Sequence, residues 1–143
     1  MIKEFQGSYR WLSNFPYVRI TLDGITYPSV EAAYQSAKSD AEDWKIFCAD
    51  GSNTSGAIKK MSRVISLVED WESKKEAVME ECLRQKFSQE PFKSNLLATG
   101  DEEIQEGNKW GDTFWGVSLY TGQGENRLGK MIMKIRSELK GGK

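Results

Sequence analysis

The stretch YVRITLDGITYPSVEAAYQSAK, residues 17–38, carries the clearest local folding signals in this chain. Two runs of alternating apolar and polar residues flank Asp23-Gly24, a pair that accepts the positive φ angles of a tight hairpin turn. Ser29 follows Pro28 as a good N-cap, and we predict a helix from it to about Lys38. The stretch therefore predicts an antiparallel hairpin that leads directly into a helix.

Helical patterns dominate the rest of the sequence. From residue 70 to about residue 88, an apolar stripe recurs at helical spacing, formed by Trp71, Val78, Cys82, Leu83 and Phe87. The last helix is predicted over about 125–139, with an apolar side formed by Leu128, Met131, Ile132, Ile135 and Leu139. Shorter helices are predicted over 41–49, after Thr54, and from Pro91 to a left-handed cap at Gly100.

Strands are expected to be few and short. Besides the hairpin, two extended pieces are predicted at 103–106 and 114–117. The expected fold class is α+β: a single compact, mostly helical domain over residues 1–143 with a small N-terminal antiparallel β portion. We expect the closing GGK, residues 141–143, to be frayed.

The composition is that of a globular chain, with 38% apolar and 29% charged residues. Its net charge of −1 provides no overall basic footprint for nucleic acid, although a local patch stays open. No apolar run approaches the ~20 residues of a membrane span, and MIKEFQGSYR lacks the features of a secretory signal. Cys48 and Cys82 are too few for a disulfide framework, so we predict a reducing, cytoplasmic location and no membrane partner.

The complete lack of histidine narrows the chemistry. It excludes Ser-His-Asp and Cys-His nucleophile systems and histidine-ligated zinc, and no CxxC pair is present. We therefore expect no metal and no cofactor. Any catalysis must use carboxylates, lysines, tyrosines, amides or backbone groups.

The first candidate site is formed by Glu31, Tyr34, Gln35 and Lys38, whose spacing of i, i+3, i+4 and i+7 places them on one helical face. A purely structural stripe at this spacing would be apolar, whereas this one is polar. The first turn of a helix also favours a carboxylate through the helix dipole. Spacing alone favours a plainer interpretation, in which Glu31 only decorates the helix start and Lys38 its end.

Three other segments have features of a binding site. EGNKWGDTFWG (106–116) combines two carboxylates, an amide and two tryptophans, which suits a flat base beside a sugar, or a loop that its tryptophans anchor to the core. GQGENRLG (122–129) opens a helix whose N–H groups could hold a phosphate, although an ordinary loop is the default and the pattern is not the dinucleotide fingerprint. WLSNF (11–15) is apolar with two polar side chains, and also fits a turn in the core.

In their order along the chain, these pieces resemble the NADAR, or YbiA-like, family. The matching segments span nearly the whole chain: WLSNF (11–15), DG-x-x-YPS-x-E-x-x-YQ-x-x-K (23–38), DWESKKEAVM (70–79), KF (86–87), LLATGD (96–101), E-x-N-x-x-x-D-x-x-WG (106–116) and GxGENRLGKMIMKIR (122–136). Each motif alone is weak, and the combination is specific.

The resemblance implies an N-glycosidase, which splits the bond between a ribose C1 and a nitrogen. Substrates in the family include ribosylamino-pyrimidine phosphates of early riboflavin biosynthesis and ADP-ribosylated guanine in nucleic acid. The shared unit is a base-like ring on a ribose that carries a 5′-phosphate or diphosphate. The near-neutral charge favours the small molecule slightly. Protein partners cannot be read from this sequence.

The resemblance also assigns roles to particular residues. Glu31 matches the family's key glutamate, and Lys38 matches a lysine associated with a Schiff base to the ribose. Trp71, Asp112 and Trp115 match positions in or beside the pocket. One departure is Ala32, where many members have histidine, and it bears on rate or substrate choice.

These roles agree with what the reaction requires, because cleavage of an N-glycoside builds positive charge on the ribose and electrons on the departing nitrogen. The predicted catalytic residues are Glu31, which stabilises the cationic sugar and assists proton transfer, Lys38, which attacks C1 of the opened ribose, and Asp112, which orients hydroxyls or water. The predicted substrate-binding residues are Asn14, Tyr34, Gln35, Arg63, Trp71, Trp115 and Asn126. In this prediction the aromatic rings stack on the base, and Arg63 or the helix start near Asn126 holds phosphate.

Two other functions stay open at this stage. The chain could be a non-catalytic module that binds ADP-ribose or a nucleotide derived from NAD. It could also be an interaction module without a small ligand.

Overall fold

The computed structural model describes residues 1–141, and its backbone contacts group them into two compact units. The hairpin unit comprises Asn14–Ser88, and the sheet unit comprises Met1–Ser13 together with the chain from Gln89 onward. The prediction of one domain over the whole length stays a prediction. Of the GGK that was predicted to be frayed, residues 142 and 143 lie outside the described residues, and the Gly141 N–H donates to the Ser137 carbonyl at 3.2 Å at the end of α6.

The hairpin unit begins with the predicted hairpin of β2 (Ile20–Leu22) and β3 (Ile25–Tyr27). Asp23 and Gly24 have φ angles of 49° and 81°, the positive values that a two-residue turn between twisted strands requires. The hydroxyls of Thr21 and Thr26 lie 2.8 Å apart across the two strands. The predicted hairpin is confirmed.

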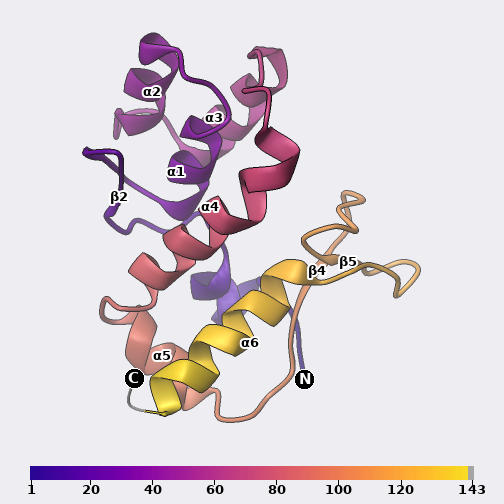
Figure 1. Cartoon of the computed structure of the whole chain (residues 1–143). Coiled ribbons are helices and arrows are strands. Elements are labelled where there is room, and N and C mark those ends of the chain that lie inside the picture. The colour runs from indigo at the N-terminus through magenta and orange to yellow at the C-terminus, as the bar shows by residue number, and fades with distance from the viewer. Residues whose placement is uncertain (142–143) are drawn as a thin grey trace. The chain divides into compact units, whose positions relative to one another are not determined.

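Helix α1 (Val30–Ser36) follows the hairpin, and Ser29 caps it as predicted: its Oγ accepts a hydrogen bond from the Ala32 N–H at 3.0 Å. All seven residues of α1 are buried. The helix packs against α2 (Glu42–Ala49), α3 (Ser55–Met61) and α4 (Trp71–Lys86), and Figure 1 shows these helices around it. A short 3-10 helix, η2 (Ser62–Val64), follows α3.

Helix α4 buries most of its predicted apolar stripe, with two differences. Val78 is only half-buried, and Lys86, a charged residue outside the stripe, is 0% exposed. Burial lowers the pKa of Lys86 to about 7, because the ammonium loses its hydration, and its Nζ lies 5.2 Å from the centroid of the Phe87 ring. A pattern of apolar spacing could not predict a buried charge.

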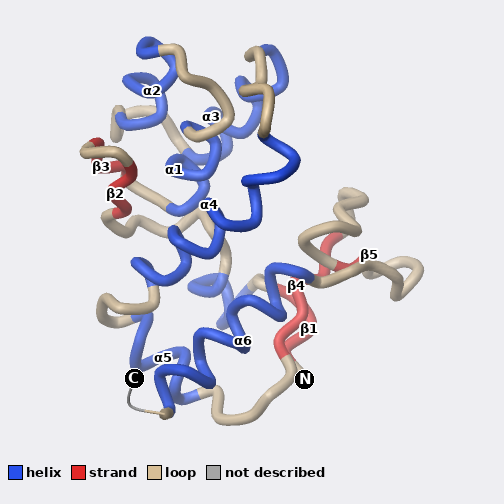
Figure 2. The backbone as a smooth tube through the Cα atoms, viewed as in Figure 1, coloured by secondary structure: helices blue, strands red, loops and turns tan. Residues whose placement is uncertain are grey.

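The sheet unit contains a three-stranded sheet in the order β1 (Ile2–Glu4), β4 (Ile104–Asn108) and β5 (Val117–Ser118), coloured red in Figure 2. Both strand pairs are parallel. The unit also contains the 3-10 helix η1 (Gly7–Leu12), α5 (Phe92–Ala98) and α6 (Arg127–Lys140). Helix α6 packs against β4 and α5 through a buried face made by Leu128, Gly129, Ile132, Ile135 and Arg136.

The predictions for this unit were right for helices and only partly right for strands. Helices α5 and α6 lie where they were expected, and Gly100 has the predicted left-handed φ of +63°. The predicted strand at 114–117 is wrong for its first three residues, because the carbonyls of Phe114, Trp115 and Gly116 accept hydrogen bonds from the start of α6. The parallel sheet was not predicted, since strands of two and three residues carry too little periodicity.

Taken as a class, the fold is α+β with helices dominating, as the sequence predicted. No helix within residues 1–141 is long and apolar enough to cross a membrane.

Candidate active site

Glu31 lies in the first turn of α1, and its side chain is unusually well buried for a carboxylate. The residue is 6% exposed, and its N–H donates to the Asn14 carbonyl at 3.0 Å. One turn later, Gln35 Nε2 donates to Glu31 Oε2 at 2.6 Å. Burial of a charged group is costly without such a bond. This environment does not fit the plainer interpretation, in which Glu31 decorates an exposed helix start.

Two side-chain oxygens beside Glu31 are buried without a hydrogen-bond partner: Gln35 Oε1 and Asn14 Oδ1. Gln35 is 4% exposed and uses its amide nitrogen on Glu31, while Asn14 Nδ2 makes only a 3.8 Å contact with Met79 Sδ. A buried acceptor without a donor costs roughly 1–3 kcal/mol, so such atoms call for an explanation. An N–H or O–H group of a bound ligand, or a water, would satisfy both.

Lys38 is half-buried at the other end of this face, beside two aromatic rings. Its Nζ lies 5.5 Å from the Tyr34 ring centroid and 6.0 Å from that of Trp71, and the two rings pack edge to face with centroids 5.2 Å apart. Burial lowers the pKa of Lys38, and this effect outweighs the opposite effect of Glu31. The amine is therefore neutral more often than an ordinary lysine.

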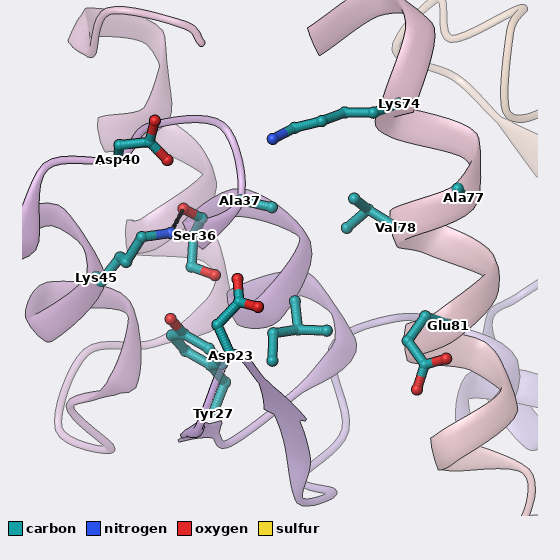
Figure 3. Close-up of a pocket in the computed structure, with 11 residues that line it drawn as sticks. Asp23, Tyr27, Ser36, Ala37, Asp40, Lys45, Lys74, Ala77, Val78 and Glu81 are labelled. Atoms are coloured by element: carbon teal, nitrogen blue, oxygen red, sulfur yellow. Dashed lines mark hydrogen bonds between the residues drawn. The ribbon is translucent and has the colours of Figure 1, made fainter. Parts of the chain in front are cut away.

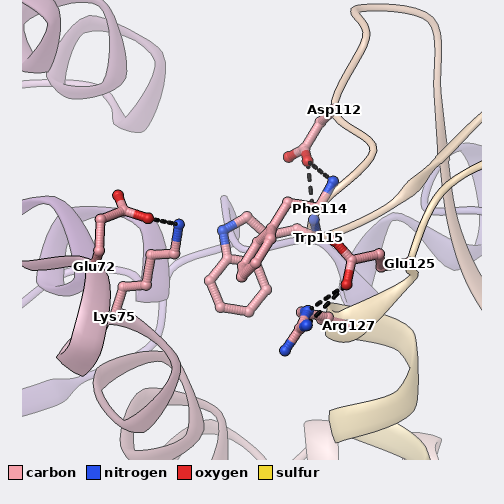
Figure 4. A network of polar contacts seen from close by, with 7 residues as sticks. All are labelled: Glu72, Lys75, Asp112, Phe114, Trp115, Glu125 and Arg127. Atoms are coloured by element: carbon pink, nitrogen blue, oxygen red, sulfur yellow. Dashed lines mark hydrogen bonds and ion pairs between the residues drawn. The ribbon is translucent and has the colours of Figure 1, made fainter.

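Two further lysines, which the sequence analysis did not single out, also lower the pKa of Lys38: Lys59 on α3 and Lys75 on α4. Lys59 Nζ lies 6.0 Å from the Phe15 ring centroid. Lys75 pairs with Glu72 at 2.8 Å, as Figure 4 shows, and follows Trp71 by one helical turn. In the sequence, Lys59 and Lys75 each belong to a pair of adjacent lysines, and nothing local distinguishes the two members of a pair. The one signal that could have pointed to the site was the i, i+4 spacing between Trp71 and Lys75.

A set of hydroxyl contacts holds these elements in place. The hydroxyls of Ser29 and Ser55 lie 2.8 Å apart, and Ser55 Oγ also donates to the Phe15 carbonyl at 3.5 Å. The Val68 N–H donates to the Lys38 carbonyl at 2.7 Å, which ties the segment before α4 to the end of α1. The starts of α1 and α3 and the Asn14–Phe15 turn thus form one connected support.

The hairpin unit therefore brings together six of the predicted site residues: Asn14, Glu31, Tyr34, Gln35, Lys38 and Trp71. Arg63 lies exposed in η2, and the positive charges that lower the pKa of Lys38 belong to Lys59 and Lys75 instead. The predicted phosphate role of Arg63 gains no support. Ala32, at the position where many relatives have histidine, is fully buried beside Glu31.

In the sheet unit, Asp112 organises the loop that carries Trp115. Its Oδ1 accepts hydrogen bonds from the N–H groups of Phe114 at 3.1 Å and Trp115 at 2.9 Å, both drawn in Figure 4. Its own N–H donates to Asn108 Oδ1 at 3.0 Å. The Trp115 ring packs edge to face on Phe114, with centroids 4.9 Å apart. One Asp112 oxygen is thus committed to loop structure, which gives a structural alternative to its predicted catalytic role.

Asn126 is likewise committed to structure. Its Oδ1 accepts from the Glu106 N–H at 2.9 Å, and its Nδ2 donates to the Ile104 carbonyl at 3.0 Å. The N–H groups of Asn126, Arg127 and Leu128 donate to carbonyls of the 114–116 loop. These donors are already used, so the geometry gives no support to a phosphate at this helix start.

A separate pocket of about 310 Å³ opens in the hairpin unit, beside the hairpin turn and α4 (Figure 3). Asp23, Tyr27, Lys45 and Lys74 are among its lining residues, whereas Glu31 and Lys38 are not. Figure 3 shows the Lys74 side chain extending from α4 toward this pocket. Within residues 1–141 no group of three acidic or cysteine side chains is placed to hold a metal ion.

The model of the NADAR domain matches residues 2–140. The chain belongs to the NADAR family. Among NADAR relatives, it is 35% identical to the N-glycosidase YbiA of Escherichia coli over 133 residues, which cover 92% of this chain and 82% of YbiA. A riboflavin biosynthesis protein of Vibrio vulnificus is 34% identical over 92% of this chain, which corresponds to 36% of that longer protein.

The NADAR fold is also supported by a solved structure. The solution structure of YbiA from Escherichia coli matches with a TM-score of 0.81 and 32% sequence identity, and the match covers 97% of this chain and 86% of YbiA. The chain is thus a homologue of an N-glycosidase with the same α+β fold.

Proposed function

We propose that this NADAR protein is an N-glycosidase that hydrolyses the bond between ribose C1 and nitrogen in a phosphorylated ribosyl-base substrate. The observation that carries the proposal is the buried Glu31 carboxylate, held by Gln35 on α1, together with the half-buried amine of Lys38, which lies two residues beyond the end of α1 and beside the Tyr34 ring. An acid and a partly neutral amine can supply the proton transfer and the nucleophile for such a reaction. The similarity to an N-glycosidase supports the same assignment.

The proposed chemistry begins with proton transfer by Glu31. When the ribose ring opens, the ring oxygen takes a proton and C1 becomes an imine to the substrate nitrogen, whose positive charge the carboxylate stabilises. Neutral Lys38 then attacks C1 and passes a proton to the substrate nitrogen, which leaves as the free amine and leaves a protonated imine on Lys38. Water adds to this imine and releases the sugar phosphate. The proton that remains on Lys38 returns to Glu31, which restores both groups.

Aromatic side chains would hold the base during these steps. Tyr34 and Trp71 already form an edge-to-face pair beside Lys38, and a flat ring could stack on either. The unpartnered oxygens of Gln35 and Asn14 would accept hydrogen bonds from ribose hydroxyls or from an amino group of the base.

Of the two substrate classes, we favour a free metabolite of the ribosylamino-pyrimidine phosphate type over ADP-ribosylated guanine in nucleic acid. Two observations support this choice. Relatives named as riboflavin biosynthesis proteins occur in both Vibrio vulnificus and Zea mays, the latter 41% identical over half of this chain. The net charge of −1 offers little attraction for a polyanionic backbone.

The test is to incubate the purified chain with substrates of both classes and to identify the products by mass spectrometry. We expect free amine and ribose 5-phosphate from the metabolite, and much slower release from the nucleic acid. Binding of the same compounds without any release would contradict the enzyme assignment and leave the nucleotide-binding module as the better description.

A second experiment tests the covalent step. Borohydride added during turnover should reduce the imine and leave a sugar phosphate attached at Lys38, which peptide mapping would locate. Release of product without any trapped adduct would remove Lys38 from the role of nucleophile while leaving the N-glycosidase reaction intact.

A further inference from the structure

Three lysines lie on α3, on α4 and just beyond the end of α1, in the group of helices that contains Glu31. Lys38 lies two residues after the last residue of α1, Lys59 lies on α3, and Lys75 lies on α4. Both α3 and α4 pack directly against α1. Two of the amines lie over aromatic rings of the site, Lys38 over Tyr34 and Trp71 and Lys59 over Phe15. Lys75 follows Trp71 by one turn on α4, so the two residues share a face of that helix.

The position of Phe15 connects Lys59 with Glu31. Phe15 directly follows Asn14, whose carbonyl accepts the Glu31 N–H at 3.0 Å, and the Phe15 carbonyl accepts from Ser55 at the start of α3. Lys59 follows Ser55 by one turn, and its Nζ lies 6.0 Å from the Phe15 ring centroid. The electrostatic influence of both Lys59 and Lys75 on Lys38 agrees with this arrangement.

We infer that Lys59 and Lys75 form a clamp for the phosphoryl group of the substrate ribose, which leaves Lys38 for the bond-breaking step. This inference rests on the proposed function. An ammonium group binds a phosphate as a point charge with up to three donors, and two of them from different helices fix its position. The pair of Lys75 with Glu72 does not prevent this, because Glu72 is 80% exposed and such surface pairs are weak.

The other predicted phosphate ligands are less suitable. Arg63 lies exposed in η2, and the N–H groups at the start of α6 already donate to loop carbonyls. The clamp also assigns different roles to the three lysines. In the proposed reaction Lys59 and Lys75 bind the phosphoryl group, whereas Lys38, half-buried beside two aromatic rings and with a lowered pKa, is the nucleophile.

The chain supplies a matched control for each lysine. Lys60 follows Lys59 on α3 and is exposed, and Lys74 precedes Lys75 on α4 and lines the separate pocket of Figure 3. We would measure the Kd of ribose 5-phosphate by calorimetry for the parent chain and for Lys59→Gln, Lys75→Gln, Lys60→Gln and Lys74→Gln. Each variant removes one charge, so net charge is the same in all four.

We expect Lys59→Gln and Lys75→Gln to raise the Kd at least about tenfold each, as the loss of a charge-assisted contact predicts, with the controls within about twofold of the parent. Lys75→Arg should retain most of the affinity, because the positive charge remains. The Kd of unphosphorylated ribose should be the same in all variants. Thermal melting followed by circular dichroism establishes that each variant is folded.

Equal weakening by all four glutamine variants would overturn the clamp, since it would show only a general charge effect. Unchanged binding in Lys59→Gln and Lys75→Gln, or no binding of ribose 5-phosphate by the parent, would overturn it as well. Parallel titrations with ADP-ribose distinguish the two sources of the phosphoryl group. A larger loss of affinity for ribose 5-phosphate in the two variants would show that the clamp binds a terminal phosphate. A larger loss for ADP-ribose would show that it binds a diphosphate.

The outcomes for the clamp and for the enzyme assignment can be separated. If the parent releases no base from any substrate while the Kd contrast holds, the enzyme assignment fails and the clamp stands. If the parent turns over substrate and the contrast is missing, the clamp alone fails.

Discussion

At the scale of single residues, the environment of Glu31 decides how the site is interpreted. The same four positions, three on α1 and Lys38 just beyond its end, fit a solvated helix face or a reactive one, and spacing cannot choose between them. Burial of Glu31 to 6% exposure, with Gln35 donating at 2.6 Å, favours the reactive interpretation. Gln35 suits this task because its amide donates to the carboxylate, whereas a second carboxylate there would repel it.

Replacing Glu31 by glutamine should lower kcat/KM by about 10²-fold or more, because the side chain keeps its shape and loses its capacity for proton transfer. Base release measured by chromatography checks this result. The matched control is Glu42→Gln, which changes an exposed carboxylate in the first turn of α2. Near-normal turnover of Glu31→Gln would exclude it as the catalytic acid.

The pH dependence of kcat/KM should report the protonation state of Lys38. Activity should rise with pH as the amine loses its proton, with a midpoint below the ordinary lysine pKa, because burial lowers the pKa of Lys38. Removal of a neighbouring positive charge raises that pKa, so Lys59→Gln and Lys75→Gln should move the rising limb to higher pH. Lys60→Gln and Lys74→Gln should leave it in place. An identical limb in all variants would show that another group controls it.

At the scale of elements, the sequence was sufficient wherever a cap or turn residue stood at a helix end or hairpin. Ser29 caps α1 as predicted, the Asp23-Gly24 pair has the predicted positive φ angles, and a short helix follows Thr54 as predicted. It was insufficient where an element depends on distant partners. Ile2 pairs with Ile104, so β1 exists only through a contact that no local pattern contains. Lys59 and Lys75 were not predicted for the same reason, because only the packing of α3 and α4 against α1 brings them near the site.

Asp112 allows the structural and catalytic roles of the 108–116 loop to be separated. Asp112→Asn keeps an oxygen that can accept from the Phe114 and Trp115 N–H groups, whereas Asp112→Ala loses both bonds. We expect the alanine variant to lose about 1–2 kcal/mol of stability and the asparagine variant to lose less, measured by urea denaturation.

Activity of the same two variants completes that test. A purely structural role predicts that Asp112→Asn retains most of its turnover. Loss of turnover in a normally stable Asp112→Asn would instead support the catalytic role predicted from the family resemblance.

At the scale of the whole molecule, Lys86 should make stability depend on pH. Its pKa is about 7 in the folded chain and 10.5 for an ordinary lysine, so the unfolded chain binds more protons between these values. The free energy of unfolding should therefore rise from pH 7 toward pH 10, by at most about 1.4 kcal/mol per pH unit. Urea denaturation at pH 7, 8 and 9 measures this slope.

Comparison with Lys86→Met isolates the contribution of this one amine. The variant should show a smaller slope over the same range, because methionine carries no proton to lose, and Lys60→Met should match the parent. The range should stop at pH 9, because burial raises the pKa of the Cys48 and Cys82 thiols to about 12, which acts in the opposite direction above their ordinary values. Parallel slopes in parent and variant would show that Lys86 stays protonated when folded.

The complete burial of α1 has a consequence for how substrate choice can change in this family. Because every residue of α1 is buried, a substitution at any of its positions would disturb the packing. We therefore expect few tolerated substitutions around Glu31 and Gln35. Lys59 and Lys75, by contrast, project from partly exposed positions on other helices. Under the proposed mechanism, changes of substrate choice would therefore fall on α3 and α4, where Lys59 and Lys75 lie, and within α1 on Ala32, which already departs from the family pattern.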